Sequence, residues 1–303
     1  MTGSAPMKTM SHLVAALLFS ATLAIAPARA QQVYASPEAA MKDLIESAKA
    51  GGPDFGERIF GKAGIDLLRS GDKEEDARRL KEFNEAAAQA AELEAPKDDE
   101  RVLRVGTNGW TFPVPLMKTS AGWAFDAEAG REEIIDRIVG HNELSAIAAC
   151  RAYVKAQDDY FRIDRDADAL REYARRIIST PGKHDGLYWE PADQTDVSPL
   201  GDLSGGVVDA DVRFPLYKGY RYKILTEQGA AAPGGAHSYL INGHMIAGHA
   251  LVAWPDKWGK TGVKTFICGE NGKVFEADLG ARSASLGEAM KRFNPGKGWT
   301  PVE

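Results

Sequence analysis

Cysteine is scarce in this chain of 303 residues, which contains only Cys150 and Cys268. Neither cysteine lies in a C-x-x-C pair or in the sequence context of a catalytic thiol, so no cysteine chemistry is predicted. In an exported chain an even number of cysteines permits a disulfide. Cys150 falls in a helical pattern and Cys268 in a strand pattern, so a bridge would join a helix to a sheet. Two buried free thiols are the alternative.

The chain also lacks an excess of positive charge. It has 37 Lys and Arg against 43 Asp and Glu, which gives a formal net charge of -6. A general nucleic-acid-binding protein needs clustered cations that replace the counterions of the phosphates, so this class is not expected. Hydrophobic residues make up 44% of the sequence, which is enough to form a globular core.

Most common catalytic motifs are missing as well. No serine lies in a G-x-S-x-G elbow, and no H-E-x-x-H pair is present. The Gly-rich run at residues 232–236 lacks the lysine and the following helix of a phosphate-binding loop. No cofactor is therefore expected.

The N-terminus carries the features of a signal peptide. Lys8 precedes an apolar run at residues 13–25, and Pro27 then leads to Ala28-Arg29-Ala30. Cleavage is expected near Ala30 and Gln31, which makes residues 1–30 a signal peptide and the mature chain periplasmic or secreted. No second apolar run approaches the roughly 20 residues of a membrane span. An uncleaved anchor is the alternative.

The remaining sequence predicts an α+β protein with two domains, at residues 31–130 and 131–303. In the first, helices are expected at 37–50, 55–60 and 73–90, then a polar connection at 91–100. Antiparallel strands follow, with a turn at Thr107-Asn108-Gly109. In the second, a long helix begins at Arg131 and is interrupted near Gly140.

A shorter helix is predicted at residues 171–178, followed by an irregular loop over 190–212. The rest is predicted as an antiparallel sheet, with strands in YRYKILT, SYLI, HALVAW, VKTFICG and KVFEADL. Asn271-Gly272 is typical of a tight turn, so the two strands beside it should form a hairpin. The second domain is thus expected to be a long helix packed on a sheet.

Several stretches resemble the bacterial envelope family called domain of unknown function 2950. They are SPEAAMKDLIESAKAG, WTFPVPLMK with GWAFDAEAG, NELSAIAACRAYVKAQDDY, KHDGLYW, SPLG, YKGYRYKILTEQG and residues 229–280. The resemblance implies no activity. The order of elements from NELSAIAACRAYVKAQDDYF onwards is also similar to the head domain of type IV pilins and pseudopilins. A whole domain precedes the comparable helix here, which argues against pilus assembly.

Three histidines are the densest titratable group. His237, His244 and His249 are candidate metal ligands, although their spacing matches no compact zinc motif. Side chains at odd spacings point to opposite faces of a strand, so only a turn at Asn242-Gly243 could bring His237 and His244 together. Surface or core histidines are the alternative.

Asp164, Asp166 and Asp168 resemble the start of a calcium-binding loop. However, Ala169 stands where a glycine is expected, and Arg175 stands in place of the bidentate glutamate. A solvated acidic turn is the favoured interpretation.

His184 and Asp185 are the candidate catalytic residues. Glu190 lies nearby, and Ser179 or Ser198 could be a nucleophile. Adjacent side chains often cannot face the same point, and the following Gly186-Leu187-Tyr188-Trp189 is more simply explained as a loop anchored by buried aromatics.

Trp254 and Trp258 flank a Pro255 turn and are candidate binding residues. Exposed aromatic side chains at the tip of a loop are suited to contact with a protein or a glycan. Packing of this loop on its own sheet is the alternative.

Taken together, these features favour an exported cell-envelope protein that binds or assembles with an envelope protein or glycan and has no enzymatic activity. The alternative is a periplasmic hydrolase that uses His184 and Asp185, or a metal-dependent enzyme that uses His237, His244 and His249.

Overall fold

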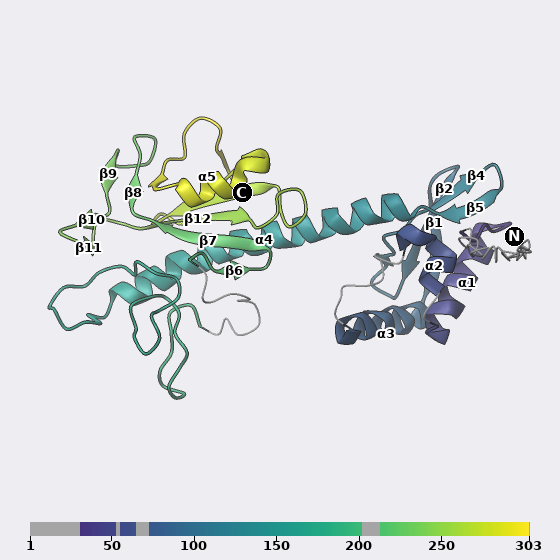
Figure 1. Ribbon diagram of the computed structural model, residues 1–303, viewed down its shortest axis with the longest axis horizontal. Coiled ribbons are helices and arrows are strands. Elements are labelled where there is room, and N and C mark those ends of the chain that lie inside the picture. The colour runs from purple at the N-terminus through teal and green to yellow at the C-terminus, as the bar shows by residue number, and fades with distance from the viewer. Residues whose placement is uncertain (1–30, 53–54, 65–72, 202–212, 303) are drawn as a thin grey trace, which may run out of the picture.

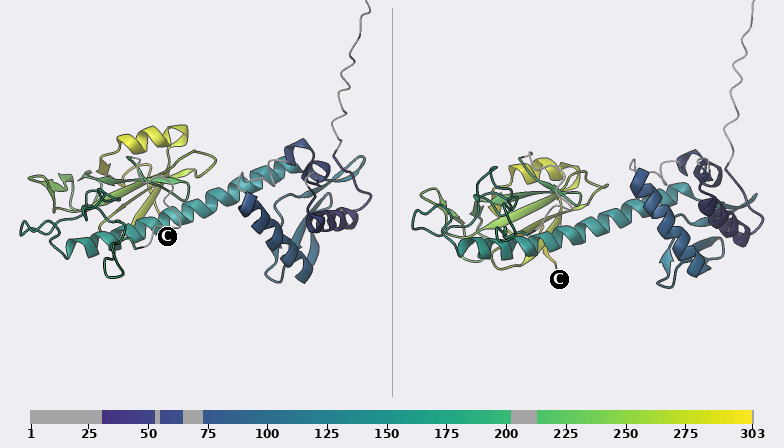
Figure 2. Two further views of the ribbon diagram at one scale, coloured as in Figure 1. Left: turned by 60° about the horizontal axis from the view of Figure 1, so that its bottom comes forward. Right: turned by 90° about the horizontal axis from the view of Figure 1, so that it is seen from below.

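The protein is organised along one long helix, α4, which runs for 35 residues from Ala127 to Phe161. The structure is a computed structural model and describes residues 31–52, 55–64, 73–201 and 213–302. Figure 1 shows a smaller lobe at the start of α4 and a larger lobe along its second half, and Figure 2 shows the same separation from two other directions. The predicted α+β class is confirmed. The expected signal peptide, residues 1–30, lies outside the described residues.

The smaller lobe contains helices α1 (Pro37–Ala50), α2 (Phe55–Phe60) and α3 (Lys73–Gln89), and a 3-10 turn η1 (Lys62–Gly64). The predicted start of α1 is confirmed, because Ser36 Oγ accepts a hydrogen bond from the Ala39 backbone N–H at 3.2 Å. Gly51 ends the helix in the left-handed conformation that glycine adopts easily, with φ 66°.

An antiparallel sheet completes the smaller lobe. Its strands are β1 (Ala91–Lys97), β2 (Glu100–Val105), β3 (Trp110–Thr111), β4 (Leu116–Thr119) and β5 (Gly122–Phe125). They follow the order β1-β2-β4-β5, with β3 also paired to β2. The polar connection predicted at 91–100 is wrong, because β1 pairs with β2 from Ala91 to Glu94 and again at Lys97, with an irregularity in register between them. Ala91 and Leu93 pack against the core of the lobe. Their apolar alternation is short and is surrounded by charged residues, so the sequence pattern does not indicate a strand.

Helix α4 begins earlier than predicted and is not interrupted. Asp126 caps it by accepting hydrogen bonds from the backbone N–H groups of Glu128 and Ala129 at 3.1 and 3.0 Å. Gly140 lies within the helix and is exposed. Residues 131–145 include no buried side chain, so this stretch of α4 packs into neither core and joins the two lobes. In the described part of the chain, no helix has the length and apolarity needed to span a membrane.

The larger lobe is built on a six-stranded sheet with the order β16-β14-β13-β12-β7-β6. The strands are β6 (Leu216–Tyr217), β7 (Tyr220–Leu225), β12 (Ala250–Pro255), β13 (Lys264–Gly269), β14 (Val274–Asp278) and β16 (Thr300–Pro301). All neighbours are antiparallel, and the predicted hairpin at Asn271-Gly272 joins β13 to β14. Helix α4 covers one face of the sheet and α5 (Ser283–Ala289) covers the other.

Two smaller sheets lie at the end of this lobe. One contains β8 (Glu227–Gln228), β9 (His237–Ser238) and β15 (Arg292–Phe293), and the other pairs β10 (Leu240–Ile241) with β11 (His244–Met245). The last 3-10 turn, η2 (Gly280–Arg282), leads directly into α5.

The helix predicted at residues 171–178 is wrong. The backbone N–H of Tyr173 donates to the Met245 carbonyl at 2.8 Å, and those of Leu187 and Tyr188 donate to the carbonyls of Arg176 and Ile177 at 3.1 and 2.8 Å. These long-range partners hold the segment extended and outcompete the local bonds of a helix. Helix α5 was missed, since only the strands of this region were read from the pattern.

Helix α4 is tied to the sheet by polar contacts as well as by its apolar face. Glu143 Oε1 accepts hydrogen bonds from the backbone N–H groups of Val263 and Lys264, both at 2.9 Å. The neighbouring Asn142 donates from Nδ2 to the Thr261 carbonyl at 2.9 Å. These contacts begin where the buried half of α4 begins and fix its register against β13.

In the smaller lobe, a carboxylate joins α1 to α2. Asp43 accepts two hydrogen bonds from Arg58, at 2.6 and 3.0 Å, and one from the Tyr34 hydroxyl at 2.7 Å. The Arg58 guanidinium is the main cause that lowers the pKa of Asp43 to about 2, against the opposing effect of burial. Because this pKa is depressed, the charged carboxylate stabilises the fold above the unfolded-state pKa of about 3.9.

This stabilisation should disappear as the pH falls from about 4 towards 2. We expect the wild-type chain to lose about 1 kcal/mol more unfolding free energy than Asp43→Asn between pH 5 and pH 3. Urea unfolding followed by circular dichroism at the two pH values measures the difference. Glu46→Gln is the matched control, because Glu46 is exposed and, among the described residues, pairs only with Lys42, at 3.9 Å. Equal losses in the wild type and Asp43→Asn would contradict the role of Asp43.

Candidate binding cavity at the end of helix α4

A cavity of about 690 Å³ opens at the C-terminal end of α4. This volume is in the range of small-molecule sites. Its wall comes from the end of α4, the long loop that follows and the end of β7. The lining residues are Tyr160, Ile163, Arg165, Asp166, Leu170, Glu172, Tyr173, Arg175, Arg176, Lys183, His184, Asp185 and Thr226.

The loop that forms most of the cavity is held by a buried amide. Gln157 on α4 donates from Nε2 to the Ala174 carbonyl at 2.9 Å, and its Oε1 accepts from the Ala174 N–H at 2.8 Å. Gln157 is fully buried, so its side chain replaces the backbone partner that a strand would provide. The residues on both sides of Ala174, Tyr173 and Arg175, are thereby placed in the cavity wall.

His184 and Asp185 both line the cavity, but they have different partners. Asp185 accepts hydrogen bonds from the Thr180 backbone N–H and hydroxyl at 2.7 and 2.8 Å. The His184 ring stacks on Trp189 at 4.2 Å between centroids, and its Nε2 lies 3.4 Å from Asp196. Burial alone would raise the pKa of Asp185, but the Thr180 hydrogen bonds outweigh burial and hold that pKa below its usual value. Asp185 is therefore a weak base.

The segment after these residues is anchored as predicted. Leu187 and Trp189 are buried, at 0% and 6% exposure, and the Trp189 Nε1–H donates to Asp196 at 2.8 Å. Of the suggested nucleophiles, Ser179 Oγ is buried with no hydrogen-bond partner among the described residues, and Ser198 Oγ donates to the Gly201 carbonyl at 3.2 Å. Neither serine is hydrogen-bonded to His184.

Arg165 is the residue of the cavity that the sequence did not single out. Its guanidinium carbon lies 4.7 Å from the Tyr160 ring centroid and 5.1 Å from that of Trp189. Its Nε is buried with no hydrogen-bond partner in the described part of the chain. The pKa of Arg165 is lowered, and burial of the side chain is the largest cause of this shift. In the sequence, Arg165 stands between aspartates, and nothing there indicates that Trp189 will contact it.

The other cations of the wall are only loosely compensated. Arg175 donates to the neutral Gly243 carbonyl at 3.0 Å, and Arg176 lies 3.9 Å from Asp185. Lys183 is exposed and, over the described ranges, has no carboxylate within 4.0 Å. Three of the four cations, Arg165, Arg175 and Lys183, thus line the cavity without an ion pair to any residue that the structure describes.

The three histidines have separate environments. His237 Nε2 lies 3.1 Å from the Ala247 carbonyl, and His244 Nδ1 lies 3.4 Å from Glu172. His249 is fully buried between Tyr153 and Tyr173, and neither ring nitrogen has a partner in the residues that the structure describes. Burial lowers the pKa of His249 to about 4, so this ring is neutral at pH 7. The structure does not bring the three histidines into one group of ligands.

The acidic residues of the loop do come together. Ligand oxygens of Asp164, Asp166 and Asp168 lie within 4.8 Å of one another. Asp164 already accepts hydrogen bonds from the backbone N–H groups of Ala167 and Ala169, both at 2.9 Å. Asp166 and Asp168 are exposed. The favoured interpretation as an acidic turn accounts for these contacts.

Trp254 and Trp258 have opposite environments, which corrects the expectation that both could bind a partner. Trp254 is 0% exposed, because α5 packs directly on its indole where Gly287 has no side chain. A Cβ at Gly287 would lie 2.5 Å from Trp254 Cδ2. Trp258 is 43% exposed and donates from Nε1 to Asp278 at 3.0 Å. Trp258 alone therefore stays a candidate binding residue.

Cys150 on α4 and Cys268 on β13 meet in the core of the larger lobe. Both are 0% exposed, and Cys268 Sγ lies 3.7 Å from the Cys150 carbonyl oxygen. Burial raises the pKa of the Cys268 thiol. The two side chains are free in the structure, and a disulfide between them stays a prediction.

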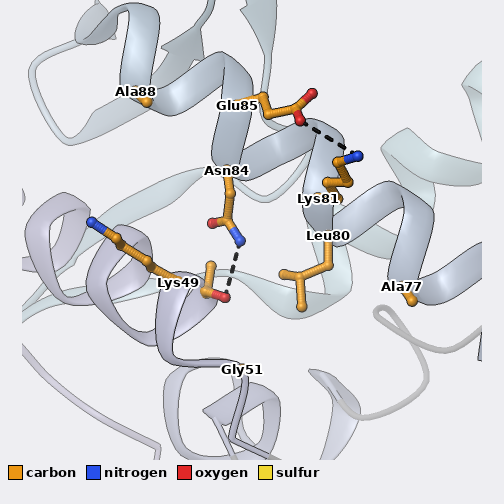
Figure 3. A pocket seen from close by; sticks show the side chains of 9 residues that line it. Lys49, Gly51, Ala77, Leu80, Lys81, Asn84, Glu85 and Ala88 are labelled. Atoms are coloured by element: carbon orange, nitrogen blue, oxygen red, sulfur yellow. Dashed lines mark hydrogen bonds and ion pairs between the residues drawn. The ribbon is translucent and has the colours of Figure 1, made fainter.

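A second hollow, of about 450 Å³, lies between α1 and α3 in the smaller lobe. Asn84 of α3 donates to the Ala48 carbonyl of α1 at 3.2 Å, and Lys81 lies 3.8 Å from Glu85 on α3; Figure 3 shows the labelled side chains and both contacts. Its wall is mostly alanine and the stems of lysines, with no set of converging polar groups. It is a shallow gap between two helices.

Comparison with known proteins identifies the chain. A family described as a protein of unknown function, DUF2950, matches residues 31–302. The chain belongs to this family. The resemblance predicted from the sequence is therefore confirmed over nearly the whole chain. Membership in DUF2950 assigns no activity to the cavity.

One relative among curated proteins is the Acyl-CoA-binding domain-containing protein 6 of Oryza sativa subsp. japonica. It is 23% identical over 204 residues, which cover 66% of this chain and 26% of that protein. This DUF2950 chain thus spans about a quarter of the length of that relative. No solved structure matches the chain, and the likeness to pilin heads stays a prediction.

The two tryptophans offer a direct test of the packing. We expect Trp254→Ala to lower the free energy of unfolding by about 3–5 kcal/mol, because a large buried side chain leaves a cavity. Trp258→Ala should cost at most about 1 kcal/mol, since it removes one exposed hydrogen bond. Urea unfolding of both variants beside the wild type measures this. A large loss in Trp258→Ala would mean that its loop is part of the core.

Proposed function

We propose that this protein is exported and acts in the cell envelope as a non-enzymatic binding protein, with the cavity at the end of α4 as its binding site. One observation carries the proposal: Arg165, Arg175 and Lys183 line the cavity without ion pairs among the described residues. Unpaired cations in a cavity of this size are suited to hold a ligand with the opposite charge.

Export is supported by the N-terminal sequence. Lys8, the apolar run at 13–25 and the Ala28-Arg29-Ala30 site form a complete signal peptide pattern. The DUF2950 match begins at residue 31, the residue after the expected cut. The mature protein then resides in the periplasm or outside the cell.

Binding is favoured over hydrolysis by the positions of His184 and Asp185. A general base must reach its proton and must be oriented by a third group. Here Asp185 accepts two hydrogen bonds from Thr180. The His184 ring stacks on Trp189, and its Nε2 lies near Asp196 rather than Asp185. These contacts stabilise the cavity wall and leave no acid-base pair.

The partner proposed is an envelope component, either a protein or a glycan. Trp258 is a second contact candidate: it is 43% exposed on the loop between β12 and β13, which contacts α4 at Asn142 and Glu143, far from the C-terminal end of that helix. The cavity and this loop are separate, so their contributions can be measured separately.

Export is tested with a reporter enzyme that is active only outside the cytoplasm. We expect a fusion of the whole chain to such a reporter to be active, and the same fusion without residues 1–30 to be inactive. The N-terminal sequence of the exported protein should begin at Gln31. Activity without residues 1–30 would overturn export by this signal.

Binding is tested by co-sedimentation of the exported protein with purified envelope fragments. We expect Lys183→Glu with Arg175→Glu to reduce the retained fraction at least about fivefold, because both changes place negative charge in the cavity. The control is Lys118→Glu with Lys273→Glu, which has the same net charge but alters exposed lysines outside the cavity. Protease treatment of the fragments distinguishes a protein partner from a glycan.

Equal retention of the two double variants would show that the cavity is not the binding site. No retention of the wild type would overturn the binding function itself. If Trp258→Ala loses retention while the cavity double variant keeps it, the binding site lies on the β12–β13 loop and not in the cavity.

A further inference from the structure

The cavity contains a partly buried cation, Arg165, that has no ion pair among the described residues. It contacts two aromatic rings, and its Nε is buried with no hydrogen-bond partner among the described residues. A guanidinium has five donors in a planar fork, and removing even the Nε–H from water is costly unless an acceptor replaces the water. The aromatic faces of Tyr160 and Trp189 attract the charge but accept none of these donors in the plane of the fork.

The stack also holds Arg165 in one place. Tyr160 belongs to the last turn of α4, and its hydroxyl donates to the His184 carbonyl at 3.0 Å. Trp189 is buried and fixed by its hydrogen bond to Asp196. Because both rings are anchored, the guanidinium is pre-organised, and a ligand that binds it loses less side-chain entropy.

Two further cations reach the same cavity from separate parts of the loop. Arg175 follows the segment that Gln157 holds, and Lys183 follows the turn at Gly182. Two carboxylates of the wall have other partners. Asp185 accepts from Thr180, and Glu172 accepts from the Met245 backbone N–H at 3.2 Å and lies beside His244.

We propose that this cavity binds a single oxyanion group, a phosphate or a carboxylate, through Arg165, Arg175 and Lys183. The inference rests on the proposed binding function and names the chemistry of the ligand. A bidentate contact between a guanidinium and an oxyanion supplies the acceptors that Arg165 lacks. Asp166 and Glu172 also line the wall and repel additional negative charge, so the site is selective against polyanions.

The cavity is larger than one oxyanion, so the ligand has a second part. Ile163 and Leu170 lie in the wall beside Tyr173, and Ile163 is 54% exposed. An apolar or sugar-like body attached to the oxyanion would cover these side chains. The structure thus assigns to the ligand one charged end and one less polar body.

The test is a titration of the exported, ¹⁵N-labelled protein with inorganic phosphate in one arm and acetate in the other, at constant ionic strength. The readout is the Nε–Hε signal of Arg165, assigned by its loss in Arg165→Met. We expect a saturable shift in at least one arm, and the stronger arm identifies the oxyanion. Lys183→Met should weaken this binding about tenfold, which corresponds to about 1.4 kcal/mol.

The matched control is Arg171→Met. Arg171 also lies over an aromatic ring, Phe161, at 5.9 Å, but it is not part of the cavity wall. Its replacement should leave the affinity unchanged. Lys183 is exposed and unpaired in the described residues, so Lys183→Met should fold even if Arg165→Met does not.

Two results would overturn the inference: a shift that grows linearly in both arms, or saturable binding that Lys183→Met leaves unchanged. If neither phosphate nor acetate gives a saturable shift while retention on envelope fragments still depends on Lys183 and Arg175, the result supports the binding function and refutes an oxyanion as the ligand. If the wild type is not retained and neither titration gives a saturable shift, both the binding function and the oxyanion ligand are refuted.

Discussion

The structure depends on the burial of the second half of α4 against β12 and β13. Ala146 and Cys150 are fully buried on this face, and their small side chains let the helix approach the sheet closely. Glu143 fixes the register of the helix by accepting hydrogen bonds from the backbone N–H groups of Val263, just before β13, and Lys264, the first residue of β13. Since α4 continues into the smaller lobe without a break, the same helix also contributes Ala127 to that lobe's core.

The position of the candidate site follows from this packing. The sheet holds the C-terminal end of α4, and that end supplies Tyr160 to the cavity and Gln157 to the loop that surrounds it. The loop has little regular secondary structure of its own. Its shape comes from buried side chains that bond to its backbone, so it is rigid where Gln157 and Asp185 hold it. A pre-organised wall of this kind suits binding, because little has to be ordered when a ligand arrives.

The sequence predicted part of this site for local reasons only. His184 and Asp185 stood out because of their residue types, and both line the cavity. Their separate partners could not be predicted, because Asp196 and Thr180 reach them through the folding of the loop. Arg165 was passed over for a similar reason. Trp189 contacts Arg165 in space but is distant from it in the sequence, so no local pattern indicates the contact.

The sequence by itself determined the family, the α+β class, the capped helix after Ser36 and the hairpin at Asn271-Gly272, because periodicity, caps and tight turns are local properties. Only the tertiary structure decided that residues 91–97 form an edge strand and that residues 171–178 are extended. It also decided that Trp254 is a core residue beneath α5. In each case the deciding partner is distant in the sequence, and its hydrogen bonds or packing outweigh the local preference of the segment.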